Sequence, residues 1–115
     1  MRGLLIGLVA LGCGPRVAPP PVSLVATSHG GRATLAAVPG PGVRINAQVA
    51  PALELNGGTV LRLTQGRMTS DSAYFAEPPW ALRRQSGPVR GILRISYCRT
   101  DEALCRAVAL PVALR

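Results

Sequence analysis

Short runs in which apolar and polar residues alternate fill most of the chain from Val22 onward, and glycine and proline separate them. An alternation of period two is the pattern of a half-buried β-strand, whereas an amphipathic helix has a longer period. The 13 glycines and 11 prolines are too frequent for a helical bundle and are typical of strands joined by turns. The sequence therefore predicts an all-β domain.

These runs and turns divide the chain after residue 21 into seven or eight short strands. Gly30 and Gly31 can supply the positive φ angles of a hairpin turn, and Asn56-Gly57-Gly58 marks a second turn. The strands are expected at 22–28, 32–38, 43–49, 53–55, 59–64, 80–84, 89–98 and 104–114. Because no amphipathic helix accompanies them, we expect one domain at 22–115 with an immunoglobulin-like antiparallel β-sandwich fold.

The first 14 residues, MRGLLIGLVALGCG, resemble a bacterial lipoprotein signal peptide. The apolar run that follows Arg2 is too short to span a bilayer as a helix. Ala10-Leu11-Gly12-Cys13 resembles a lipobox, in which the peptide is cut before a cysteine that then carries acyl chains. We expect a signal peptide at 1–12, followed by lipidated Cys13 and a Pro-rich tether at 13–21. The alternatives are an ordinary secretory signal with a chance cysteine, or a buried first strand.

The expected lipid anchor gives the protein a membrane partner and a location. Gly14 stands where an Asp would resemble an inner-membrane retention signal, so we expect the outer membrane, facing the periplasm. That compartment is oxidising. Since Cys13 is assigned to lipid, Cys98 and Cys105 remain as an even pair of thiols.

The positive charge of the chain does not identify a specific partner. All 13 basic residues are arginine and the net charge is +8, which favours anionic partners. The arginines are dispersed along the chain, however, and dispersion favours a general role in solubility. The two Tyr, one Phe and one Trp are scattered and cannot form a base-stacking platform. We expect no nucleic-acid partner.

The last two predicted strands carry the cysteine pair in matching positions. A hairpin that places Cys98 opposite Cys105 also places Ile95 opposite Val108, so the apolar faces match in the register that joins the cysteines. A slip of one residue would spoil both matches. Opposed residues of an antiparallel pair lie within disulfide range. The sequence therefore predicts a Cys98–Cys105 disulfide on the strand face that points away from the core.

Metal binding and hydrolysis are poorly represented in the sequence. His29 is the only histidine and adjoins two glycines, and a C-x6-C pair alone lacks the spacing and ligand count of a zinc site. The chain has no G-x-S-x-G elbow and no glycine motif for phosphate or a dinucleotide. We expect no metal and no cofactor.

The disulfide is then either a structural staple or a redox pair. A staple of this ring size stabilises by about 2 to 3 kcal/mol on the chain-entropy model. Arg99 and Arg106 each follow a cysteine and are candidates to stabilise thiolates, a role that Asp101 and Glu102 oppose. Both interpretations stay open on the residues alone.

The segment GILRISYCRTDEALCRAVALPVAL resembles the end of the periplasmic amino-terminal domain of the disulfide interchange protein DsbD. It is also similar to the terminal β-sandwich of bacterial thioredoxin–NHL-repeat proteins. The resemblance implies that Cys98 and Cys105 form a redox-active disulfide that exchanges with a thioredoxin-like or other thiol–disulfide partner. The alternative is a non-catalytic binding or structural lipoprotein in which the disulfide is only a staple, so whether the protein is an enzyme stays open.

Residues 65–79, QGRMTSDSAYFAEPP, show no strand alternation. Loops of this length are often functional. We expect this loop to lie over or near the cysteine hairpin, where Tyr74 and Phe75 would limit access to the thiols. The alternative is an ordinary surface loop.

Lipid anchoring can be tested at the cysteine that would carry the acyl chains. Replacement Cys13→Ser should abolish acyl labelling and move the protein from the detergent phase to the aqueous phase, because no other residue is assigned to lipid. Phase partition and labelling with a fatty-acid analogue measure the effect. Labelling that survives the substitution would contradict the prediction.

Overall fold

A computed structural model describes residues 19–115 of the chain. The predicted signal peptide at 1–12 and Cys13 lie outside the described residues, as does most of the predicted tether. Within the described part of the chain, no helix is long and apolar enough to cross a membrane.

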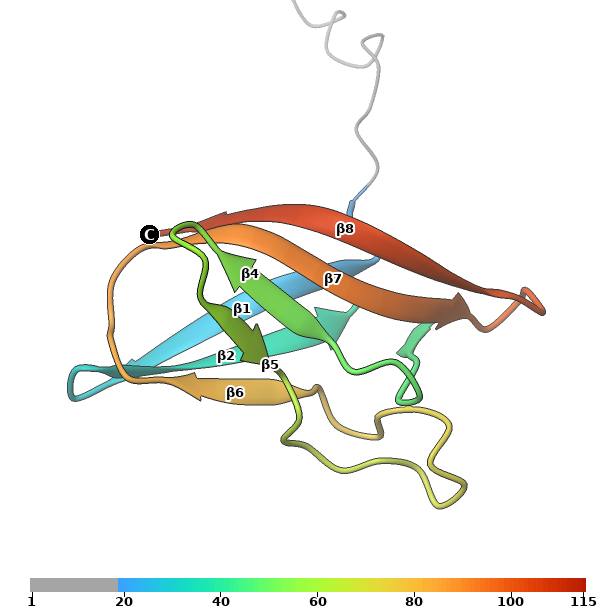
Figure 1. Cartoon of the computed structure of the whole chain (residues 1–115). Helices are drawn as coiled ribbons and strands as arrows, with labels where there is room; N and C mark the ends of the chain where they lie inside the picture. Colours follow the sequence, from blue (N-terminus) through green and yellow to red (C-terminus); the bar gives the residue numbers. More distant parts are fainter. Residues whose placement is uncertain (1–18) are drawn as a thin grey trace, which may run out of the picture.

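Eight strands make up the described domain (Figure 1). They are β1 (Val22–His29), β2 (Arg32–Pro39), β3 (Val43–Ile45), β4 (Ala52–Leu55), β5 (Val60–Arg62), β6 (Trp80–Arg83), β7 (Val89–Arg99) and β8 (Cys105–Leu114). Gly30 and Gly31, both with positive φ, connect β1 to β2 as the sequence predicts. Every strand pair is antiparallel.

The strands form two sheets. The first has the order β1-β2-β6, and the second contains β3, β4, β5, β7 and β8. The long strand β7 pairs with β8 along one edge, while β3 and β4 pair with the two ends of its other edge. The prediction of an all-β sandwich of seven to eight short strands is confirmed.

The core lies between the inner faces of the two sheets and is built from aliphatic side chains. Leu35 of the first sheet and Leu53 and Leu93 of the second are completely buried. On β7, the buried inner face follows the period of two that the sequence shows, from Val89 to Tyr97. Burial of a full aliphatic side chain stabilises a fold by about 1.5 to 3 kcal/mol, so these positions fix which face of β7 points inward.

The register of β7 and β8 is the one expected from the sequence. Cys98 lies opposite Cys105, and Ile95 lies opposite Val108. Figure 1 shows the two strands as a long twisted pair that runs along one edge of the second sheet. The prediction of this register is confirmed.

Strand β3 is shorter than the expected strand at 43–49. It ends at Ile45 because Asn46 starts a turn, in which its side-chain Oδ1 accepts a hydrogen bond of 2.9 Å from the Gln48 N–H. This local hydrogen bond competes with continued strand pairing. Val49 is consequently 48% exposed, although the alternation alone predicts that it is buried.

Gly91 of β7 packs against the backbone of β4 more closely than any other residue type allows. A Cβ atom there would clash with the backbone oxygen of Glu54 and lie 3.0 Å from the Leu55 Cα. Backbone atoms of a paired strand cannot move aside as a flexible side chain can. The β4–β7 pairing therefore depends on glycine at this position.

Replacement Gly91→Ala should lower the free energy of unfolding by about 2 kcal/mol or more, because β4 must shift away from β7. Replacement Gly40→Ala is the matched control, since a Cβ there meets its nearest atom, the Pro21 oxygen, at 3.4 Å. Urea unfolding of residues 19–115 measures both. Equal stability of the two variants would show that β4 and β7 are not held this tightly.

Candidate functional site

The disulfide between Cys98 and Cys105 joins the end of β7 to the start of β8. The two Cα atoms lie 4.1 Å apart, directly across the strand pair. Both side chains lie on the face of the second sheet that points away from the core, because Tyr97 and Ile95 occupy the inner face. The bond that the sequence predicts is present in the structure.

The two cysteines differ in exposure. Cys105 is exposed, whereas Cys98 is only 4% exposed. The outward-facing side of the hairpin therefore leaves Cys105 open to solvent but not Cys98. Cys98 belongs to a central strand, with β8 on one side and β3 on the other. Cys105 belongs to a strand at the edge of the sheet.

Arg44 of β3 is the charged residue placed directly beside the buried cysteine. It lies opposite Cys98 in the β3–β7 register, so the two side chains share the outer face. The next pair along is Asn46 and Ser96, whose side chains are joined by a hydrogen bond of 3.2 Å from Asn46 Nδ2 to Ser96 Oγ. The hydroxyl of Ser96 is thus satisfied although this residue is 4% exposed.

The long loop at 65–79 reaches the same face of the sheet through Tyr74. This residue pairs with Asn46, and its ring lies under the Arg44 guanidinium, whose central carbon is 4.2 Å from the ring centroid. Tyr74 therefore contacts the neighbour of the disulfide. Phe75 has a different place: its N–H donates to the Ile45 oxygen over 3.0 Å, and its side chain packs against the core.

Of the two residues predicted to limit access to the thiols, only Tyr74 lies on the face that carries the disulfide. Consecutive residues of an extended segment point to opposite sides, which is why the aromatic pair is divided between that face and the core. A shielding effect of the loop on the disulfide stays a prediction, and only Tyr74 is placed to contribute to it.

Hydrogen bonds inside the loop hold Tyr74 in place. The Asp71 carboxylate accepts from the Thr69 hydroxyl over 2.6 Å and from the Ala73 N–H over 3.1 Å. These bonds lower the pKa of Asp71, with the Thr69 hydroxyl as the largest cause. A lowered pKa in the folded state means that the bonds stabilise the loop above the ordinary pKa of the carboxyl. The stabilisation is lost as the pH falls through the lowered value.

The two arginines that follow the cysteines in the sequence lie on the other face of the hairpin. Arg99 lies beside the Tyr97 ring, with its guanidinium carbon 5.6 Å from the ring centroid. Arg106 is directly opposite Tyr97, and its Nη2 is 3.1 Å from Oε2 of Glu102. The structure brings neither of them together with the sulfurs, because adjacent residues of a strand face opposite ways.

A shallow hollow surrounds the exposed cysteine. Residues 102–106 line it, and Leu104 at its edge is 77% exposed. A single exposed leucine is common on protein surfaces, and this one lies next to the exposed cysteine. The alternation predicts Leu104 as the first residue of a strand at 104–114, but β8 begins at Cys105, and Leu104 lies in the turn before it.

Metal ligation and homology add no further site. No group of three or more His, Cys, Asp and Glu side chains gathers anywhere in residues 19–115, and His29 lies at the β1–β2 turn.

Comparison of the chain with protein-family models, with curated proteins and with solved structures gives no match. The resemblance to the DsbD domain therefore stays a prediction from the sequence.

The position of Arg44 makes a prediction about the disulfide. Replacement Arg44→Gln should lower its reduction potential by about 10 to 30 mV, because a positively charged residue opposite Cys98 in the register favours the thiolate. The upper value corresponds to about 1.4 kcal/mol. Solvent screening lowers the electrostatic effect of Arg44, because this residue is exposed.

Equilibration with glutathione buffers measures this potential. Replacement Arg99→Gln is the matched control, because it removes the same charge from the opposite face of the hairpin. Equal shifts in the two variants would mean that only net charge acts on the bond.

Proposed function

We propose that the protein takes part in thiol–disulfide exchange through the Cys98–Cys105 pair. The observation that carries the proposal is the difference between the two cysteines, since one sulfur-bearing residue is exposed and the other is buried beside an arginine. Exchange requires an attacking thiolate to reach one sulfur while the other leaves. A single exposed cysteine at the edge of a sheet meets that requirement.

The exchange runs in two steps. A partner thiolate attacks Sγ of Cys105, a mixed disulfide forms, and the Cys98–Cys105 bond breaks so that Cys98 leaves as a thiolate. A second thiolate of the partner then attacks the partner sulfur of the mixed disulfide and releases Cys105 as a thiolate. The thiolates take up protons from solvent. Two electrons pass from the partner dithiol to the protein, and the reverse sequence returns them.

Residues around the pair support the two steps in different ways. Arg44 lies opposite the leaving cysteine in the strand register, and its positive charge favours the thiolate. Leu104 beside Cys105 offers an apolar contact to the partner. A thioredoxin-like protein is the partner that the sequence resemblance implies. The lipobox-like segment that ends at Cys13 supports a lipid-anchored protein at the outer membrane, facing the periplasm.

A purely structural disulfide is the second candidate, and the burial of Cys98 favours it. The bond ties the β7–β8 hairpin where β3 also pairs, so it strengthens the part of the sheet that holds the long loop. The protein would then be a binding or structural lipoprotein. The two candidates differ in the potential of the bond and in its response to a partner.

A thioredoxin-like protein that retains only its attacking cysteine tests the proposal. Mixed with the oxidised wild-type protein, it should form a mixed disulfide at Cys105, and alkylation should trap the released Cys98 thiol. Peptide mapping identifies both positions. The potential of the bond should lie above about −300 mV, the region of structural disulfides.

Two outcomes would contradict the proposal in separate ways. An adduct at Cys98 would still support thiol–disulfide exchange, but it would show that the partner attacks Cys98 and that Cys105 leaves. No adduct, together with a potential below about −300 mV, would show that the disulfide is a staple. The same mapping on the Leu104→Ser variant reports whether the exposed leucine contributes to docking, because this substitution leaves both sulfurs in place.

A further inference from the structure

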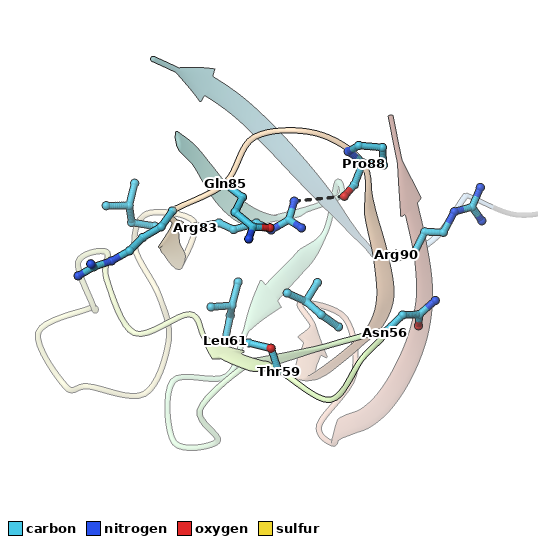
Figure 2. A pocket seen from close by; sticks show the side chains of 10 residues that line it. Asn56, Thr59, Leu61, Arg83, Gln85, Pro88 and Arg90 are labelled. Carbon is cyan, nitrogen blue, oxygen red and sulfur yellow. Dashed lines mark hydrogen bonds between the residues drawn. The ribbon is translucent and has the colours of Figure 1, made fainter. Parts of the chain in front are cut away.

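A pocket of about 580 Å³ opens at the end of the sandwich far from the disulfide (Figure 2). It lies where β5 and β6, the edge strands of the two sheets, face each other, and it includes Pro88 and Arg90 at the start of β7. The disulfide lies at the other end of the same strand. Pockets of this volume are in the range that holds small ligands.

The floor of the pocket is apolar. Leu55 and Leu61 line it and also pack against the hydrophobic core, so the floor is continuous with the interior of the sandwich. Leu82 of β6 lines the same pocket and is 46% exposed. An apolar chain that entered the pocket would cover leucine surface that water now contacts.

The polar part of the pocket carries positive charge only. Three of its lining residues are arginines, namely Arg83, Arg84 and Arg90, and none is acidic. Within residues 19–115 no carboxylate lies within 4.0 Å of any of these three guanidinium groups, since the salt bridges there involve other arginines. The pocket therefore lacks a counter-charge of its own.

Arg83 is held in position across the pocket. Its Nη1 donates to the backbone oxygens of Gly87, over 3.4 Å, and Pro88, over 3.1 Å. Figure 2 shows this side chain extending toward Pro88, with Leu61 on the opposite wall and Arg90 at the rim, pointing outward. The other nitrogens of the Arg83 guanidinium have no partner among the hydrogen bonds of the described residues, and they can donate to an anion.

We propose that this pocket binds a small amphipathic anion, with its apolar chain on the leucine floor and its carboxylate or phosphate head at Arg83. The apolar floor selects for a chain, and the arginines select the sign of the charge. The site requires no part of the disulfide, so the proposal is independent of thiol–disulfide exchange.

Titration calorimetry with four probes tests the chemistry of the site. Octanoate and octyl phosphate should bind, whereas octyltrimethylammonium, which has the same chain and the opposite charge, should not. Acetate, which has the head without the chain, should bind at least about tenfold more weakly than octanoate, since it covers no leucine surface. Equal binding of octanoate and octyltrimethylammonium, or of octanoate and acetate, would overturn the proposal.

Substitutions in the oxidised protein locate the site. Arg83→Gln should weaken octanoate binding about tenfold, the loss expected for a charge-assisted hydrogen bond. Arg90→Gln should weaken it less than Arg83→Gln, because Arg90 lies at the rim and points outward, and this substitution removes no structural hydrogen bond. Arg67→Gln, in the long loop, is the matched control and should leave binding unchanged. Binding that survives both pocket substitutions would place the ligand elsewhere and overturn the proposal. If the pocket and the disulfide are separate sites, bound octanoate should leave the rate of disulfide reduction unchanged.

Discussion

The inward face of β7 is the constraint on which the rest of the structure depends. This strand pairs with β8, β3 and β4, and its buried side chains form the centre of the core. Because side chains alternate, the burial of Leu93, Ile95 and Tyr97 fixes Ser96 and Cys98 on the other face. A shift of β7 by one residue would expose its core residues and separate Cys98 from Cys105. The position of the disulfide is thus a consequence of core packing.

Local patterns were sufficient for most of the fold. Alternation and glycine turns predict the eight strands to within a few residues, and the match between the β7 and β8 patterns predicts their register and the disulfide. The same patterns fail where a local hydrogen bond competes with pairing, as at Asn46, which ends β3 early. They also predict no strand pairing in the long loop, although Tyr74 pairs with Asn46, the residue that follows β3.

The surroundings of the disulfide were less predictable, and the reason is non-local pairing. Arg99 and Arg106 adjoin the cysteines in sequence, but alternation places them on the opposite face. Arg44 lies more than fifty residues from Cys98 in the chain and becomes its neighbour only through the β3–β7 register. Nothing in the short strand at Val43–Ile45 specifies that partner, since three residues match many registers equally well. Proximity in sequence was therefore a poor guide to electrostatics.

The burial of Cys98 has opposite consequences for the two interpretations of the disulfide. A staple gains from complete burial of both sulfurs, because protection from thiols keeps it intact. The sheet buries one cysteine only, and it exposes the other on an edge strand next to an exposed leucine. For exchange, an attacking thiolate needs one accessible sulfur, and the burial of Cys98 directs the attack to Cys105. The exposed cysteine belongs to the edge strand β8, and the buried one to β7, which also pairs with β3. The arginine that β3 places opposite Cys98 lies on the shielded side of this disulfide.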